Sequence, residues 1–295
     1  MVLWALMDSL APSLGHTCSI GHIDHGLQPG ADAAQVIQER AAATGQAVHI
    51  TTLALAPGAD LQARARVARY EALHQMARTN AADAILTAHH ADDQAETVLM
   101  RACRGTGLGG LSAIRWNRAD GVLRPLLDTS RADLHAAATS LRVSWWEDPT
   151  NATDTYHRNQ MRHTAIPALE AVSPGAAKGL ARTAANVAGS GEAMEHWVDV
   201  ALAPLVVRSA DTLLLPRHIV PSDTALISPL LSWICREFAM NPPSQAAVRQ
   251  LVQTLRVDRD SSSRDRSSIS ISTSCDLHGL HVQIDANNVT FCRTK

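Results

Sequence analysis

Short apolar runs alternate with helical stretches along the first half of this sequence, and this alternation constrains the fold most strongly. Strands are expected at residues 17–24, 48–53 and 84–88, and helices at residues 31–43, 60–78 and 92–103. Strands and helices in alternation predict a parallel sheet with helices on its faces. The fold class expected for this half is therefore α/β.

Polar residues follow two of the predicted strands. Parallel α/β sheets bind their ligands beyond the carboxyl ends of the strands, so these side chains are candidates for a binding site. They are His22, Asp24 and His25 after the first strand, and Thr87, His89 and His90 after the third.

The pattern changes after about residue 165. Helices are expected at residues 165–203 (broken near Pro174), 225–240 and 246–255, an exposed loop at 258–266, and strands at 268–273, 280–284 and 289–292. We therefore predict two domains. Residues 1–168 form the α/β domain, and residues 169–295 form a smaller helical and α+β domain with a small antiparallel sheet.

Composition limits the class of protein. A hydrophobic fraction of 46% with 18% charged residues is globular rather than disordered. The five cysteines contain no C-x-x-C pair, which suits a reducing cytoplasm. No apolar run approaches the roughly 20 residues that span a bilayer, so no membrane segment is expected. The net charge of −2 means that any nucleic-acid site must be a local basic patch.

Residues 87–97 carry the strongest chemical signal. Asp93 and Glu96 have capping-box spacing, so these acids can simply start a helix. Two adjacent acids, Asp92 and Asp93, preceded by two histidines also suit a magnesium–nucleotide site, because carboxylates hold hard cations beside phosphates. A transition-metal site can be built from the same residues. The residues alone leave these interpretations open.

Several motifs together resemble the tRNA(Ile)-lysidine synthetases, which belong to the N-type ATP pyrophosphatase (PP-loop) superfamily. The resemblance covers most of residues 1–170 and is specific because the motifs keep their order and spacing. The motifs are His22-Ile-Asp-His-Gly-Leu27, Ala63-Arg-Ala-Arg-Val-Ala-Arg-Tyr70, the segment 87–97, Arg104-Gly-Thr-Gly-Leu-Gly-Gly-Leu111, Arg124-Pro-Leu-Leu127, Glu147-Asp-Pro-Thr-Asn151 and Arg158-Asn159 with Arg162-His163.

The resemblance implies roles for individual residues. Charge stabilisation around the phosphates would fall to His89, Asp93 and Arg69, and magnesium to Asp92 and Asp93. The segment 104–111 would be a lid near lysine and tRNA. The implied nucleotide-binding residues are His22, Asp24, His25, Thr87 and Ala88, and the implied lysine- or tRNA-binding residues are Arg104, Gly105, Gly107, Arg158, Asn159 and Arg162.

The resemblance also implies a two-step reaction. ATP adenylates the C2 carbonyl oxygen of the wobble cytidine in tRNA(Ile) with a CAU anticodon, and pyrophosphate leaves. The ε-amine of L-lysine then attacks C2 and expels AMP. A urea-like carbonyl is a poor electrophile, so the adenylate supplies the missing leaving group. ATP and Mg²⁺ are the expected cofactors, and the sequence leaves open whether the protein is a homodimer.

The glycine-rich S-G-G-x-D-S loop of this family is not found in the sequence. The family order places that loop immediately before Met1. We therefore expect the true start to lie upstream of Met1, the chain being a mis-started gene model, a truncated gene or a fragment. Without the phosphate cradle, we expect these 295 residues to be inactive.

Three other functions remain open at this stage. A PP-loop tRNA thiolase typically needs paired cysteines, which this arrangement does not offer. A non-catalytic tRNA-binding or degenerate protein would fit the missing loop. A metal-dependent hydrolase could use the His/Asp cluster, but it gives the arginine-rich block at 158–163 no evident task.

Overall fold

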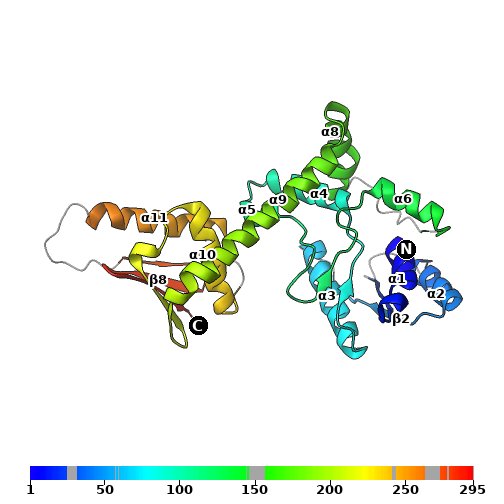
Figure 1. The fold of residues 1–295 in the computed structure, drawn as a ribbon, viewed down its shortest axis with the longest axis horizontal. Helices are drawn as coiled ribbons and strands as arrows, with labels where there is room; N and C mark the ends of the chain where they lie inside the picture. Colours follow the sequence, from blue (N-terminus) through cyan, green and yellow to red (C-terminus); the bar gives the residue numbers. More distant parts are fainter. Residues whose placement is uncertain are drawn as a thin grey trace. The chain divides into compact units, whose positions relative to one another are not determined.

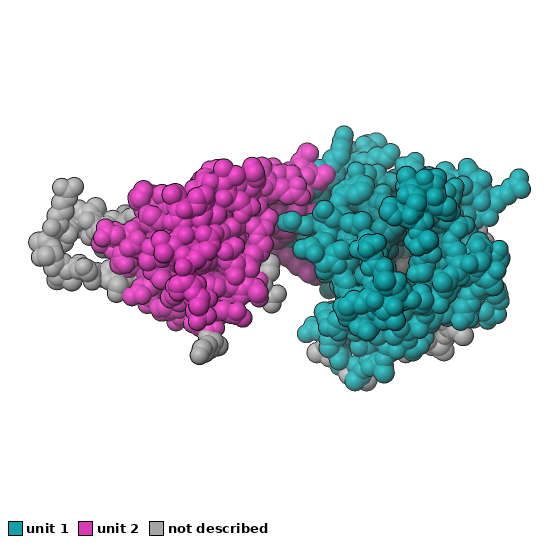
Figure 2. Space-filling view, turned by 60° about the horizontal axis from the view of Figure 1, so that its bottom comes forward, with its two compact units in different colours: residues 1–103, 113–184 teal, residues 104–112, 185–295 magenta. Residues whose placement is uncertain are grey.

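The computed structural model describes residues 1–24, 32–56, 58, 60–143, 145, 157–240, 244–262, 273–277 and 279–294. It contains two compact units (Figures 1 and 2). Unit 1 comprises residues 1–103 and 113–184, and unit 2 comprises residues 104–112 and 185–295. The division between 184 and 185 falls inside helix α9 (Ala176–Trp197). The domain boundary expected after residue 168 stays a prediction.

Unit 1 is built from helices and two short parallel strand pairs. Its elements are α1 (Val2–Leu10), the 3-10 turn η1 (Pro12–Leu14), β1 (Ile20–Asp24), α2 (Asp32–Thr44), β2 (Val48–Thr52), α3 (Leu61–Thr79), β3 (Ile85–Leu86), α4 (Ala91–Ala102), β4 (Val122–Leu123), α6 (Arg131–Ser140), α7 (His157–Gln160), the π-helical turn η3 (Met161–Ala165), α8 (Ile166–Val172) and the first part of α9.

Unit 2 contains the remaining elements. They are α5 (Leu108–Leu111), the rest of α9, the π-helical turn η4 (Val198–Leu202), the 3-10 turns η5 (Ala203–Leu205) and η6 (Arg217–Ile219), β5 (Val207–Arg208), β6 (Thr212–Pro216), α10 (Thr224–Glu237), α11 (Gln245–Ser262), β7 (Thr273–Asp276), β8 (Leu280–Ile284) and β9 (Asn288–Arg293).

The parallel strands of unit 1 confirm the predicted α/β class. β1 pairs with β2 from Ile20 opposite Val48 to Asp24 opposite Thr52. β3 pairs with β4, with Ile85 opposite Val122. Helix α3 packs against both β1 and β3. The carboxyl end of β3 leads directly into α4, and this junction positions the candidate site.

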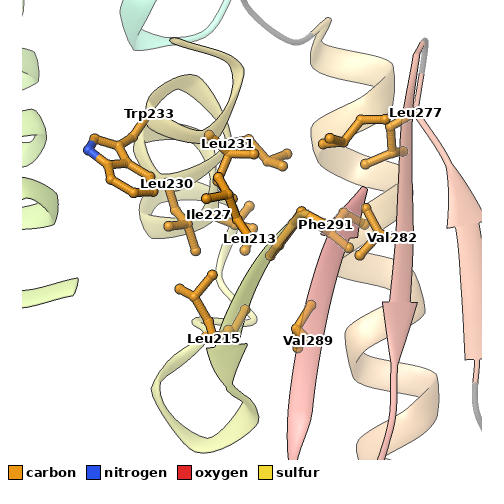
Figure 3. Packing of buried hydrophobic residues seen from close by; sticks show 14 of the residues in the cluster. Leu213, Leu215, Ile227, Leu230, Leu231, Trp233, Leu277, Val282, Val289 and Phe291 are labelled. Carbon is orange, nitrogen blue, oxygen red and sulfur yellow. The ribbon is translucent and has the colours of Figure 1, made fainter. Parts of the chain in front are cut away.

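Unit 2 contains the larger hydrophobic core. Its five strands form an antiparallel sheet in the order β5-β6-β9-β8-β7. Burial alternates along β6, where Leu213 and Leu215 are buried, and along β9, where Val289 and Phe291 are buried, as expected when one sheet face packs on helices. Figure 3 shows these strand residues facing the apolar side chains of α10, including Ile227.

The second half departs from the prediction in two places. β5 and β6 lie in a segment for which no strand was expected, although Leu213, Leu214 and Leu215 are consecutive and apolar. The loop expected at 258–266 is wrong in part, because α11 continues to Ser262. Residues 263–272, which include most of the strand expected at 268–273, lie outside the described residues.

None of the helices in the described part of the chain is long and apolar enough to cross a membrane.

Replacing a fully buried side chain of unit 2 should lower its stability. Ile234 in α10 is 0% exposed and lies in the unit 2 core. We expect Ile234→Ala to lower the free energy of unfolding by about 3 kcal/mol, because it leaves a cavity. Urea unfolding followed by circular dichroism measures this. The control Val207→Ala, at a 65% exposed position of the same unit, should change little; equal losses in both variants would contradict the assigned core.

Candidate active site

Four residues separate the end of strand β3 from the start of helix α4, and the first turn of this helix is fixed by carboxylates. His90 is the N-cap residue, and its backbone N–H donates to Asp93 Oδ2 at 3.0 Å. Asp92 Oδ2 accepts a hydrogen bond of 2.7 Å from the backbone N–H of Arg131. The imidazole of His90 lowers the pKa of Asp92, and the Arg131 N–H adds to this against the opposing effect of burial. The capping role expected from the spacing therefore holds for Asp93.

Glu96 has a different role, because it is buried and paired with two arginines. It is 1% exposed and lies one turn after Asp93 on the same face of α4. Its Oε2 lies 2.6 Å from Arg158 Nε, and its Oε1 lies 2.6 Å from Arg162 Nε. Arg158 Nη2 also reaches Asp93 Oδ1 at 2.7 Å. We call Asp93, Glu96, Arg158 and Arg162 the carboxylate–arginine network.

The carboxylate–arginine network is balanced in charge. Two carboxylates face two guanidiniums, and the fork of Arg158 bridges both acids. Burial would lower the pKa of Arg158, but the hydrogen bonds and charges of Glu96 and Asp93 outweigh it and raise that pKa above its ordinary value. The network therefore fixes α4 against α7 and η3, which carry the two arginines.

His89 lies just before the start of α4 and is neutral at neutral pH. Burial is the main cause that lowers the pKa of His89 to about 4; the charges of Arg124, Arg66 and Arg158 also lower it, and Asp93 opposes them. His89 Nδ1 lies 3.0 Å from Thr87 Oγ1. If the threonine hydroxyl donates to Nδ1, the proton of the neutral ring sits on Nε2, where it can be donated to an anion.

A second group of arginines surrounds Tyr70, which is 7% exposed. The guanidinium carbons of Arg66, Arg69 and Arg118 lie 5.2, 5.5 and 4.6 Å from the centroid of its ring, which is within cation–π range. Arg124 Nη2 donates to the Tyr70 hydroxyl at 3.4 Å. We call these five residues the Tyr70 cluster. Since Arg66 and Arg124 both depress the pKa of His89, the cluster adjoins that histidine.

Other residues predicted for the site lie on other elements or outside the residues that the structure describes. Asp24 ends β1 and His22 lies in the middle of that strand, which belongs to the other strand pair. No hydrogen bond or ion pair between described residues joins His22 to His89. Burial lowers the pKa of His22, while Asp24 opposes this. His25 lies outside the described residues. Ala88 is exposed between Thr87 and His89.

The predicted lid belongs to unit 2. Arg104 is exposed, and Gly105 has a φ of 68°, in the left-handed region that favours glycine. A Cβ at Gly107 would clash with the side chain of Gln245, so this position packs closely on α11. Part of the segment forms the short helix α5. The lysine- or tRNA-binding roles of these residues stay predictions, as does the role of the buried Asn159 on α7.

The carboxylates do not form a metal site in this arrangement. Both oxygens of Asp93 already accept hydrogen bonds, one from the His90 N–H and one from Arg158. Within the described chain, no group of three or more His, Cys, Asp or Glu side chains is arranged to hold a metal ion. A guanidinium stands where a cation would neutralise Asp93, so the residues as placed do not fit Mg²⁺.

Sequence reasoning missed the central roles of Glu96 and Tyr70. Glu96 was interpreted only through its capping spacing, although its i, i+3 relation to Asp93 places both acids on one helix face. Tyr70 was part of a motif, but its ring gave no sign that three arginines would gather on it. Arg118, which follows Asn117 in an unremarkable polar stretch, carried no signal at all.

Removing the charge of Glu96 should destabilise unit 1. Glu96→Gln leaves two partly buried guanidiniums without their partner, and breaking a buried pair from one side costs about 3 kcal/mol. Thermal and urea unfolding measure the loss. Glu71→Gln, an exposed position on α3, is the matched control and should leave stability unchanged; a neutral effect of Glu96→Gln would contradict the network.

Lowering the pH should destabilise the protein through His89. Its pKa falls from 6.5 to about 4 on folding, so the unfolded chain binds more protons between these values. Stability contributed by the neutral imidazole is therefore lost as the pH falls through that window. Allowing for partial exposure, we expect His89→Gln to remove about 2 kcal/mol of this pH dependence.

Urea unfolding at a series of pH values between 7 and 4 measures how the free energy of unfolding of the His89→Gln protein depends on pH. The exposed His16→Gln serves as the control and should follow the unsubstituted protein. A His89→Gln curve parallel to that of the unsubstituted protein would show that His89 is not held neutral.

Comparison with known proteins gives a consistent family. The PP-loop domain model matches residues 1–169. The tRNA(Ile)-lysidine synthase of Salinispora tropica is 41% identical over 210 residues, which cover 68% of this chain and 63% of the relative. The corresponding enzyme of Thermobifida fusca is 37% identical, with 71% and 67% covered. That of Xanthomonas campestris pv. campestris strain 8004 is 38% identical, with 81% and 56% covered.

A solved structure supports the fold alone. The U34-tRNA thiolase NcsA from Methanococcus maripaludis, with its [4Fe-4S] cluster, matches with a TM-score of 0.52 at 16% identity, covering 63% of this chain and 66% of that one. The match to the first sequence relative spans less than two thirds of that relative's length. The match to the PP-loop domain model and the likeness to these relatives show that the chain belongs to the PP-loop family, among the tRNA(Ile)-lysidine synthases.

Proposed function

We propose that this protein takes part in an ATP-dependent tRNA modification that attaches lysine to C2 of the wobble cytidine in a CAU-anticodon tRNA(Ile). ATP would adenylate the C2 carbonyl oxygen, and the lysine ε-amine would then displace AMP. The relatives named as tRNA(Ile)-lysidine synthases support this assignment over 68 to 81% of the chain.

One structural observation carries the proposal. Residues from four separate sequence motifs act on His89 in unit 1: Arg66 of α3, Asp93 at the start of α4, Arg124 after β4, and Arg158 of α7. A nucleotide brings several negative charges that must be held while one phosphorus is attacked. Guanidinium groups beside a partly buried, neutral imidazole supply hydrogen-bond donors for such charge without needing to reorganise.

The residues would share the work as follows. Arg69 would contact a phosphate of the nucleotide, and His89 would donate from Nε2 to the charge that develops on a phosphate oxygen. Asp93 would hold the start of α4, and with it His89, in place. Arg158 and Arg162 would act through Asp93 and Glu96, with which they pair. Mg²⁺ takes no part in these roles, because the carboxylates as placed do not offer it a site.

The remaining assignments rest on the family resemblance. Arg104, Gly105 and Gly107 are proposed to contact lysine or tRNA, and His22, Asp24 and Thr87 the nucleotide. An enzyme acting on tRNA in this way would work in the cytoplasm. These contacts and this location are proposed for the whole protein, of which the region matched to the relatives is one part.

A labelling assay tests the proposed reaction. The chain, and a version extended upstream in the same reading frame, are incubated with ATP, radiolabelled lysine and a tRNA(Ile) transcript bearing the CAU anticodon. We expect label in the tRNA with the extended form, and we expect His89→Gln to slow the transfer about a hundredfold. A transcript whose wobble cytidine is replaced by uridine is the matched control and should remain unlabelled.

Two results would contradict the proposal. Label entering the uridine transcript equally would exclude recognition of the wobble base. Absence of transfer from both forms, together with ATP-independent hydrolysis of the transcript, would favour a hydrolase.

A further inference from the structure

The Tyr70 cluster carries more positive charge than its surroundings neutralise. Its four guanidiniums belong to Arg66, Arg69, Arg118 and Arg124, and Asp120 pairs with Arg118 at 2.6 Å. No other carboxylate of the described residues forms an ion pair with these four side chains. Arg66, Arg69 and Arg124 thus have no carboxylate partner among these residues. Like charges held together repel each other, so a counter-charge from outside the chain would stabilise the cluster.

Arg124 shows this most clearly. It is 2% exposed, the most buried of the four arginines, and its Nη1 donates to the backbone carbonyl of Arg115. Its buried Nε has no hydrogen-bond partner in the structure. A buried guanidinium donor without an acceptor is costly, and a ligand oxygen placed there would remove that cost.

The ring of Tyr70 sets the spacing of the other three arginines. Arg66 and Arg69 come from the same face of α3 at i, i+3, and Arg118 comes from the turn before β4. All three guanidinium carbons lie within 5.5 Å of the ring centroid. Because the ring attracts cations, it can hold together groups that would otherwise move apart.

We propose that Tyr70 is a positioning residue that holds Arg66, Arg69, Arg118 and Arg124 as a binding site for a polyphosphate, of the kind present in a nucleotide. A single carboxylate could not satisfy four guanidiniums, whereas linked phosphates offer several oxygens and several charges to their planar forks. The inference rests on the proposed function for the source of the phosphate, but the site can be tested with pyrophosphate alone.

The phenol of Tyr70 reports on the cluster. Burial alone would raise the pKa of Tyr70, but the hydrogen bond from Arg124 and the charges of Arg66, Arg124 and Arg69 outweigh it and hold that pKa below its ordinary value. The other titratable groups near the cluster are Asp120 and His74, which pair at 3.0 Å beside Arg118, and His89, whose pKa Arg66 and Arg124 lower. An anion bound to the guanidiniums would offset their charge, so the pKa of Tyr70 should rise on binding.

Replacing the chain's other tyrosine makes the absorbance of Tyr70 measurable by itself. The chain has two tyrosines, Tyr70 and Tyr156, so in a Tyr156→Phe protein the ultraviolet absorbance of tyrosinate follows Tyr70 alone. Titration with and without pyrophosphate should show a raised Tyr70 pKa in its presence. Calorimetry should show binding that Arg66→Gln weakens about tenfold, while Arg78→Gln, an exposed arginine on the same helix, leaves it unchanged.

Two substitutions at Tyr70 separate positioning from folding. Tyr70→Phe keeps the ring and should bind pyrophosphate within about threefold of the original, while Tyr70→Leu loses the ring and should bind about tenfold more weakly. Circular dichroism confirms that each variant is folded. If Tyr70→Leu does not fold, the comparison of Arg66→Gln with Arg78→Gln still decides whether the cluster binds phosphate.

Comparing three ligands in the Tyr70 titration shows which molecule supplies the phosphate. A Tyr70 pKa raised by pyrophosphate and by ATP assigns the site to the nucleotide. A rise with the tRNA transcript alone supports a phosphate site that takes the RNA backbone. An unchanged pKa with all three ligands, or equal binding by Arg66→Gln and Arg78→Gln, overturns the inference. Pyrophosphate binding without lysine transfer would keep this site and remove the ligase proposal.

Discussion

The burial of Glu96 is the constraint on which the candidate site depends. A carboxylate that is 1% exposed must have charged partners, and here both come from one segment, as Arg158 and Arg162. Arg158 extends the pairing to Asp93, which closes the first turn of α4. The position of His89 follows from this, because it directly precedes the capped turn. Residues more than 60 positions apart therefore fix one imidazole between two groups of arginines.

These two groups of arginines differ in what they leave for a ligand. In the carboxylate–arginine network, the acids of α4 neutralise the charges of the two guanidiniums. The main role of this network is therefore structural. In the Tyr70 cluster, only Arg118 pairs with an acid among the described residues, and the aromatic ring attracts the guanidiniums without cancelling their charge. The neutral His89 lies where the fields of both groups meet. The site thus presents free positive charge on one side and a rigid, neutralised support on the other.

Much of the fold could be predicted from the sequence, because hydrophobic periodicity and strand–helix alternation are local signals. The helices α2, α3 and α4 lie within two residues of their expected bounds. The strand β6 was missed because its three consecutive leucines do not alternate with polar residues. Motif resemblance selected His89, Asp93 and Arg69. The pairing of Glu96 with Arg158, and the gathering of Arg118 on Tyr70, depend on long-range contacts that no local pattern records.

The choice of guanidinium over ammonium groups around Tyr70 has a chemical consequence. The whole chain contains two lysines, Lys178 and Lys295, and neither belongs to the Tyr70 cluster or the carboxylate–arginine network. An activated carbonyl reacts with any free amine within reach, and a guanidinium, which keeps its proton, is a poor nucleophile. A site lined with arginine can hold phosphates without offering a competing amine. In such a site no side chain of the protein would attack the activated base in place of the incoming amino acid.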